Sequence, residues 1–281
     1  MEQQNWDRII RSKTKWYDLK LNEIFKYRDL IILFVRKNFM TRYKQTILGS
    51  AWILINPLFS MISYTIVFGG IAGLSTDGVP KPLFYLASNI LWGFFAGCLG
   101  QTSATFTGNV GVFGKVYFPR MVSPISTVIT ALFDYLIQFL LFVALAIVYA
   151  MHGQAINWNI TVLLLPLLLL ELAMLGMGFG IIIAAATTKY RDLCILVGFG
   201  MTIWMYASPV IYSTTLVPEK FMGIYMLNPV APIMMTFKYA FFGIGSIPYF
   251  YIGMSWLTTL IVLFAGMLVF NKVERTFMDT V

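Results

Sequence analysis

The chain has 281 residues, of which 59% are hydrophobic and only 11% are charged, and its formal net charge is +8. An ordinary soluble domain carries about 25% charged residues, and a soluble fold of this length could not bury so much apolar surface. The composition therefore excludes a soluble protein. It predicts a single all-α integral membrane protein, because uncharged apolar runs of about 18 or more residues can cross a bilayer as helices.

Residues 1–50 form a charged segment ahead of the first apolar run. Its apolar residues recur at helical spacing, with basic and acidic residues between them, at Leu21, Ile24, Phe25, Ile31, Phe34 and Val35. This pattern predicts an amphipathic helix along the inner surface of the membrane. A cytoplasmic helix that packs on a partner is the alternative. No cleavable signal peptide is expected, because the segment is long and charged and has no short apolar core with a cleavage site.

Six apolar runs follow, each long enough to cross a bilayer. They lie at about 51–73, 83–105, 124–150, 160–188, 193–213 and 249–271. The sequence therefore predicts a transmembrane domain of six helices over residues 51–281. Between the fifth and sixth runs, residues 214–248 are apolar but rich in proline and glycine. We expect one or two short re-entrant or interfacial helices there, forming an extracytoplasmic gate region.

The distribution of basic residues predicts the orientation. With both termini in the cytoplasm, 17 of the lysines and arginines lie on the inner side and only Lys81, Lys220 and Lys238 lie outside. This asymmetry is the one that membrane insertion favours, and the inner basic residues also suit anionic lipid headgroups. The positive charge therefore indicates membrane topology, and no nucleic-acid partner is expected.

Motifs for catalysis, nucleotides or metals are not found in the sequence. The segment GNVGVFGKV resembles a phosphate-binding loop, but Gly108 and Gly114 are wrongly spaced and Val116 replaces the hydroxyl residue that binds magnesium. The segment GMGFG, from Gly176 to Gly180, fits close helix packing better than a dinucleotide loop. Cys98 and Cys194 lie in apolar runs, so no disulfide framework is expected, and the lone His152 does not favour a metal site. ATP hydrolysis would therefore require another polypeptide.

Two carboxylates lie inside predicted spans. Asp134 is in the third span, one turn before Gln138 on the same face, and Glu171 is near the middle of the fourth. A charged carboxylate at the centre of a membrane helix costs about 2.5–3.5 kcal/mol, so both should face protein or water. They could line a hydrated path or serve as structural helix contacts.

Aromatic residues in the spans allow two interpretations. Most should pack between helices or anchor the chain at the membrane interface. A minority could stack on sugar rings that pass through the protein, and the candidates are Trp92, Phe94, Phe95, Trp204, Tyr206 and Tyr212.

Over nearly its whole length the sequence resembles the transmembrane subunits of ABC exporters that move lipid-linked polysaccharides, such as O-antigen, capsule or teichoic acid, out of bacteria. The motifs that carry the resemblance are FKYRDLIILFVRKNFMTRYKQTILGSAWILINP, KVYFPR, KYRDL, IWMYASPVIY and VPEKFMGIYMLNP, in this order relative to the six spans. The resemblance implies a homodimer in the bacterial inner membrane, joined to two copies of a separate ATPase subunit that uses ATP and magnesium. This chain would bind no cofactor, and O-antigen is the favoured substrate.

The resemblance also assigns roles to residues of this chain. It implies ATPase docking by a loop that contains Lys115, Tyr117, Phe118, Pro119 and Arg120. It implies a cytoplasmic entrance formed by Arg42, Tyr43, Lys44, Gln45, Arg191 and Asp192. It implies an outer gate formed by Pro209, Tyr212, Pro218, Glu219, Asn228 and Pro229. The residues proposed to line the translocation path are Trp92, Phe94, Phe95, Asp134, Glu171, Trp204 and Tyr206.

Two other functions remain open from the sequence. One is a drug or lipid exporter of the same architecture, and the other is a membrane-embedded glycan-modifying enzyme. The second lacks the His-Asp or paired-acid constellation that such chemistry requires. The sugar repeat, the lipid carrier and the number of membranes in the envelope are not encoded in recognisable motifs.

Overall fold

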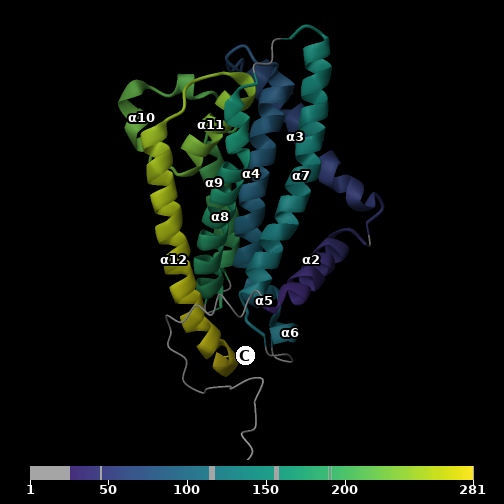
Figure 1. Cartoon of the computed structure of the whole chain (residues 1–281), viewed down its shortest axis with the longest axis vertical. Coiled ribbons are helices and arrows are strands. Elements are labelled where there is room, and N and C mark those ends of the chain that lie inside the picture. The colour runs from purple at the N-terminus through teal and green to yellow at the C-terminus, as the bar shows by residue number, and fades with distance from the viewer. Residues whose placement is uncertain are drawn as a thin grey trace, which may run out of the picture.

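The computed structural model describes residues 26–44, 46–113, 118–154, 158–188, 190 and 192–280, with the backbone alone for residues 110 and 274–280. Every regular element in these ranges is a helix. The long helices run side by side as a bundle, with α10 and α11 at one end and α2, α5 and α6 at the other (Figure 1). The all-α fold predicted from the composition is confirmed.

Five of the six predicted spans are long helices in the structure. Within the described residues, five helices are long and apolar enough to cross a membrane, and they are these five. The first combines η1 (Gly49–Ala51), α3 (Trp52–Tyr64) and the π-helix η2 (Thr65–Ile71), and the others are α4 (Lys81–Ser103), α7 (Val122–Met151), η3 (Ile160–Leu164) with α8 (Leu165–Thr187), and α12 (Tyr249–Thr280). The chain is therefore a multi-pass membrane protein.

The remaining predicted span, 193–213, is only partly helical. Helix α9 (Leu193–Tyr206) has 14 residues, which is about 21 Å of helix, against a hydrocarbon core of about 30 Å. The chain then turns through Ala207 to Ser213. Pro209 lies in this turn, and proline cannot supply the N–H group that a continuing helix needs. The count of six spans is therefore not confirmed.

The segment 214–248 contains the short helices predicted for it. A 3-10 turn, η4 (Thr214–Leu216), precedes α10 (Glu219–Tyr225) and α11 (Val230–Phe242). Helix α11 is largely buried in the bundle and ends at Gly243, whose φ of +68° suits a residue without a Cβ. Whether these helices are re-entrant stays a prediction.

The N-terminal helix that the structure describes is α2 (Arg28–Tyr43), which packs mainly on α7. Phe34 is buried, with its ring 5.5 Å from that of Phe118, whereas Ile32 and Leu33 are exposed. The predicted apolar positions Leu21, Ile24 and Phe25 lie outside the described residues. The position of this helix at the membrane surface stays a prediction.

Helix α4 is the centre of the bundle and packs against α3, α7 and α8. Helix α8 lies between α4 and α12, and its glycines allow both contacts. A Cβ at Gly180 would lie 2.8 Å from the Leu99 carbonyl oxygen on α4, and one at Gly178 would lie 3.0 Å from Leu263 Cα on α12. Gly178 and Gly180 are two residues apart and therefore lie on different faces of α8, whereas Gly176, four residues before Gly180, shares its face and also meets α4. The GMGFG segment is thus a packing motif, as predicted.

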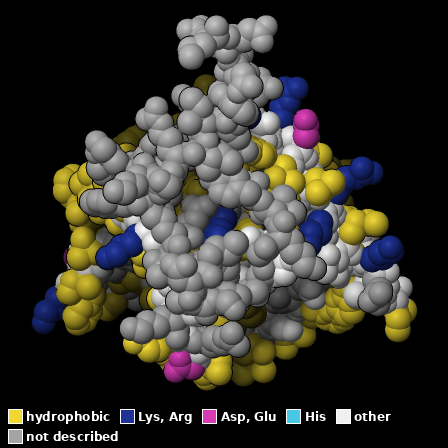
Figure 2. All heavy atoms as spheres, turned by 90° about the horizontal axis from the view of Figure 1, so that it is seen from below, with side chains coloured by type: hydrophobic (Ala, Val, Ile, Leu, Met, Phe, Trp, Pro, Cys, Tyr) yellow, Lys and Arg dark blue, Asp and Glu magenta, His cyan; other side chains and the backbone are white. Residues whose placement is uncertain are grey.

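The two ends of the bundle differ in charge. The end that carries α2, with the short helices α5 (Thr105–Gly108) and α6 (Val110–Phe113), shows Lys and Arg side chains around its rim in Figure 2. The exposed basic residues just before α2, on it, just after it and in the last third of α12 are Lys26, Arg28, Arg36, Lys37, Lys44 and Lys272. At the opposite end, the described basic residues are Lys81, Lys220 and the buried Lys238.

Candidate functional site: a polar pocket between α2, α3, α4 and α7

An ion pair joins the end of α2 to the middle of α7. Arg42 Nη1 donates a hydrogen bond to Asp134 Oδ2, although the two residues are 92 positions apart in the chain. The Arg42 side chain is 34% exposed and that of Asp134 is 14% exposed. A carboxylate in a membrane-spanning helix is costly without a partner, and Arg42 supplies the opposite charge. The structure thus joins a predicted entrance residue to a predicted path residue.

Tyr43 lies next to this pair. Burial raises the pKa of the Tyr43 hydroxyl, and the charge of Asp134 raises it further, while the Arg42 guanidinium acts in the opposite direction. The phenol therefore stays protonated near neutral pH and can donate a hydrogen bond.

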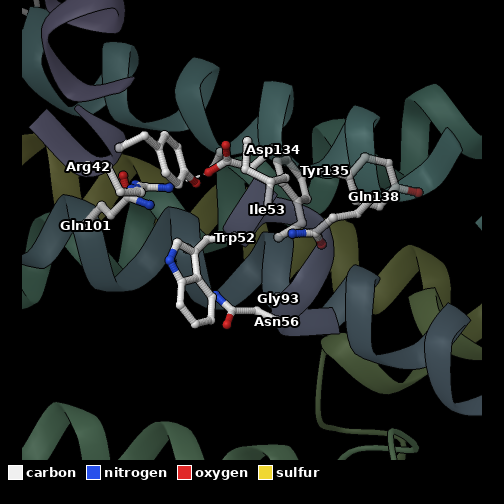
Figure 3. A pocket seen from close by; sticks show the side chains of 13 residues that line it. Arg42, Trp52, Ile53, Asn56, Gly93, Gln101, Asp134, Tyr135 and Gln138 are labelled. Carbon is white, nitrogen blue, oxygen red and sulfur yellow. Dashed lines mark hydrogen bonds and ion pairs between the residues drawn. The ribbon is translucent and has the colours of Figure 1, made fainter. Parts of the chain in front are cut away.

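A pocket of about 390 Å³ opens beside the ion pair. In Figure 3, Arg42 and Gln101 lie on one side of Trp52 and Gln138 lies on the other. Its polar or aromatic lining residues are Arg42, Tyr43, Trp52, Asn56, Phe94, Gln101, Asp134, Tyr135 and Gln138, and the remaining ones are Ile53, Gly93, Gly97 and Ala131. We call this cavity the Arg42 pocket. Its size lies at the lower end of the range of small-ligand sites, about 300–1,000 Å³.

Of the other predicted entrance residues, Lys44 and Asp192 are exposed and neither lines the Arg42 pocket. Gln45 and Arg191 lie outside the described residues. The role of this group as an entrance therefore stays a prediction, with Arg42 and Tyr43 brought together in one site.

The predicted docking loop is only partly described, since Lys115 and Tyr117 lie outside the described residues. Phe118 and Arg120 are buried. The Arg120 guanidinium lies 5.5 Å from the centre of the Phe113 ring. Pro119 is partly exposed. The side chains of Phe118 and Arg120 therefore pack inside the protein. A contact of this loop with an ATPase stays a prediction.

Most of the aromatic path candidates pack against one another. The Phe95 ring lies 5.0 Å from that of Trp204 and 5.4 Å from that of Trp92. Phe94 is buried against Tyr135 and also lines the Arg42 pocket, whereas Tyr206 is exposed. Only Phe94 and Asp134 of the predicted path residues therefore line this pocket.

Glu171 is fully buried on α8. Neither of its carboxyl oxygens has a hydrogen-bond partner among the described residues. It faces protein and not lipid, as expected for a carboxyl group in a span. Its part in a translocation path stays a prediction.

The predicted outer-gate residues gather at the opposite end of the bundle, where Asn228 connects α9 to α11. Its side-chain oxygen accepts hydrogen bonds from Trp204 Nε1 at 2.8 Å and from the Val230 backbone N–H at 3.1 Å. Its Nδ2 donates to the Ala207 carbonyl at 3.1 Å and to Ser208 Oγ at 2.9 Å. The amide therefore satisfies donors and acceptors on both segments.

The other gate residues extend this connection. The Tyr212 hydroxyl donates to the Tyr206 carbonyl at 3.1 Å, and the Pro229 carbonyl accepts from Ser255 Oγ at 2.8 Å. Burial raises the pKa of the Tyr225 hydroxyl, and the neighbouring Tyr212 raises it further. Pro218 and Glu219 are exposed at the start of α10, where a carboxylate suits the positive end of the helix dipole.

Two residues of this end were not among the individual gate residues predicted, although Lys238 lies within the predicted gate region, 214–248. Lys238 is buried in α11, and its Nζ donates to the Pro209 carbonyl at 2.6 Å and lies 3.8 Å from the centre of the Phe84 ring. Asp77 accepts a hydrogen bond from Thr215 at 3.0 Å and another from Ser213. Lys238 could have been identified from the sequence, because a lysine in an apolar segment is unusual. No sequence feature pointed to Asp77.

Replacing Asn228 by alanine should destabilise the protein by about 1–3 kcal/mol, because the partners of its amide, among them the buried Ser208 and Val230, lose their hydrogen bonds. The thermal unfolding midpoint in nanodiscs would fall, and hydrogen exchange would speed up in residues 207–230. Asn56→Ala is the matched control, since the Asn56 amide makes no hydrogen bond to the described residues and its loss should leave the midpoint unchanged. Equal effects of the two substitutions would contradict the role given to Asn228.

A family model described as ABC-2 type transporter matches residues 29–242. The chain belongs to the ABC-2 type transporter family. The family resemblance predicted from the sequence motifs is confirmed, and the chain is a membrane-embedded transport subunit.

The relatives of this ABC-2 chain include proteins named as O-antigen export permeases. An O-antigen export system permease protein, RfbA, of Klebsiella pneumoniae is 26% identical over 252 residues, 89% of this chain and 94% of the relative. The RfbA protein of Myxococcus xanthus is 27% identical over 225 residues, 79% of this chain and 84% of its own length. The inner membrane transport permease YadH of Escherichia coli K12 is 24% identical over 204 residues, 69% of this chain and 77% of the relative.

Proposed function

We propose that this chain is the membrane-spanning subunit of an ATP-driven exporter that moves lipid-linked O-antigen polysaccharide across the bacterial inner membrane. The observation that carries the proposal is its similarity to O-antigen export permeases over about nine tenths of both chains. The match to YadH is shorter, and the name of that protein states no substrate, so it favours no other cargo. A polar polymer cannot cross hydrocarbon unaided, so the subunits must enclose a hydrated path.

The motor of this exporter is a separate ATPase. The ABC-2 family assignment and the lack of a nucleotide-binding motif in the sequence support this division of work. Two copies of the chain would join two ATPase subunits, which bind ATP and magnesium, while this chain binds no cofactor. The segment from Lys115 to Arg120 would dock on the ATPase, with the partly exposed Pro119 available for contact.

Both termini would lie in the cytoplasm. The greater number of exposed lysines and arginines at the α2 end supports this orientation. Five long helices alone would place the termini on opposite sides. The sixth crossing is therefore assigned to α9 together with residues 207–213, while α10 and α11 lie at the outer end as re-entrant gate helices.

Substrate would enter at the α2 end, near Arg42, Tyr43 and Lys44. Lys44 is exposed and suits the phosphate of a lipid carrier and the headgroups of membrane lipids. At the outer end, the hydrogen bonds of Asn228 hold α9 and α11 together until ATP-driven movement of the bundle opens the path.

Deleting the gene for this chain should remove O-antigen from the cell surface and leave lipid-linked glycan in the cytoplasm. A plasmid copy should restore surface glycan only in cells that also contain the ATPase. Surface glycan would be measured with an O-antigen antibody on intact cells, and intracellular glycan after lysis.

The plasmid copy can also carry a photo-crosslinking amino acid to test the docking surface. A crosslinker at Pro119 should capture the ATPase, and one at Glu219 on the opposite end should not. Normal surface glycan in the deletion strain would refute the proposed function. Capture of the ATPase from Glu219 alone would refute the orientation and the docking site.

A further inference from the structure

The Arg42 pocket holds uncharged hydrogen-bonding groups that the protein itself does not use. Asn56, Gln101 and Gln138 line it, and none of their amides makes a hydrogen bond to the described residues. The same is true of the indole N–H of Trp52. Each amide offers two N–H donors and a carbonyl acceptor. Because polar groups within a membrane domain are costly to leave unpaired, these groups must meet water or a ligand.

The charge of the pocket is balanced. Arg42 is already paired with Asp134, so the lining has no net charge from these two groups. A phosphate would have to displace the carboxylate and would then remain close to its negative charge. Asp134 Oδ1 is enclosed by the protein and is therefore out of reach of a ligand in the pocket. The electrostatics therefore favour a neutral ligand with hydroxyl groups over an anion.

The aromatic side chains that line the pocket restrict the chemical class of the ligand further. Trp52 lies within the pocket, and Tyr43 and Phe94 add two more rings. A sugar ring combines an apolar face of C–H groups with a rim of hydroxyls. An aromatic face can cover the apolar side, while planar amides bind the hydroxyls.

We infer that the Arg42 pocket binds a neutral sugar unit of the exported glycan. Trp52 covers one face of the sugar, and the amides of Asn56, Gln101 and Gln138 bind its hydroxyls. The exposed Lys44, outside the pocket, is left for the phosphate of the carrier. This assignment rests on the proposed function and adds the chemical class that this site selects.

The pocket offers a position for a reporter thiol. Gly93 lines it, and a Cβ added there would meet no atom within 4 Å. The full chain carrying Gly93→Cys and Cys194→Ser would be placed in nanodiscs of phosphatidylethanolamine and phosphatidylglycerol, with Cys98 buried and silent. The measured quantity is the rate of maleimide labelling, with and without neutral trisaccharides of glucose, mannose or N-acetylglucosamine, or inorganic pyrophosphate.

At least one trisaccharide should slow labelling about tenfold when its concentration is about ten times Kd, since protection follows 1 + [L]/Kd. Pyrophosphate at the same concentration should not slow it. Trp52→Leu and Gln138→Leu should each abolish the protection while keeping the thermal unfolding midpoint, because neither side chain bonds to the described residues. Labelling of the exposed Cys194 in the unaltered chain is the control, and sugar should not change it.

Protection by pyrophosphate alone, or by none of these probes, would overturn the assignment. The thiol could also be labelled slowly without any sugar and become fast to label when phosphatidylcholine replaces the other two lipids. That result would assign the pocket to a lipid headgroup and overturn the proposal. Cells that export glycan normally while no sugar slows labelling would refute the pocket assignment and not the proposed function. Sugar protection in a chain whose deletion leaves surface glycan intact would refute the function instead.

Discussion

Replacing Gly180 by alanine should destabilise the subunit by about 1–3 kcal/mol or prevent it from folding. The added Cβ would lie 2.6 Å from Thr102 Cβ and 2.8 Å from the Leu99 carbonyl oxygen. Both atoms belong to α4, and a backbone oxygen cannot move aside as a flexible side chain can. Helix α8 would therefore have to separate from α4, on which most of the residues from Leu83 to Leu99 are buried.

Gly100→Ala on α4 is the matched control, because a Cβ at Gly100 meets no atom within 4 Å. Alanine is the better helix former by about 1 kcal/mol, so this variant should be as stable as the wild type or more so. The thermal unfolding midpoint in nanodiscs separates the two outcomes. If Gly180→Ala proved as stable as Gly100→Ala, the close α4–α8 contact would be refuted.

Neutralising one member of the Arg42–Asp134 pair should lower the free energy of unfolding more than neutralising both members. Arg42→Gln leaves the less exposed Asp134 without its partner in a membrane span, which we expect to cost about 2–3 kcal/mol. Asp134→Asn should cost less, about 1 kcal/mol, because Arg42 is about one third exposed and can turn to water. The double variant should regain most of the stability, since no unpaired charge remains.

Chemical unfolding of the four proteins in the same detergent gives this double-mutant cycle. A coupling energy of about 1–3 kcal/mol is typical of residues that share an ion pair. High salt should reduce the coupling only slightly if the pair is sheltered, as the 14% exposure of Asp134 indicates. Additive single effects would show that the pair contributes nothing to the contact between α2 and α7.

The spans could be predicted because the bilayer imposes a length and an apolar composition on any helix that crosses it. The run from Ala51 to Gly73 became α3 with its flanking turns, and the segment 214–248 became two short helices. The end of α9 could not be located from hydropathy. Residues 207–213 are apolar, but Pro209 and the bonds of Ser208 and Ala207 to Asn228 favour a turn.

The site was less predictable than the fold because it joins residues from distant parts of the chain. Asp134 and Gln138 were recognisable as polar residues in a span, and the resemblance to a known family pointed to Arg42. Their ion pair depends on how α2 packs on α7, which periodicity does not encode. Trp52 and Gln101 are ordinary residues of an apolar helix until the fold places them around one pocket.

Reconstitution of the purified chain in lipid vesicles, with and without its ATPase, tests the exporter most directly. Lipid-linked O-antigen would be supplied on the face where the ATPase binds, and its arrival on the other face would be measured with a lectin sealed inside the vesicles. We expect arrival only when both proteins and hydrolysable ATP are present. Arrival with this chain alone, or none while the complex hydrolyses ATP, would contradict the proposal that this subunit forms a path worked by a separate motor.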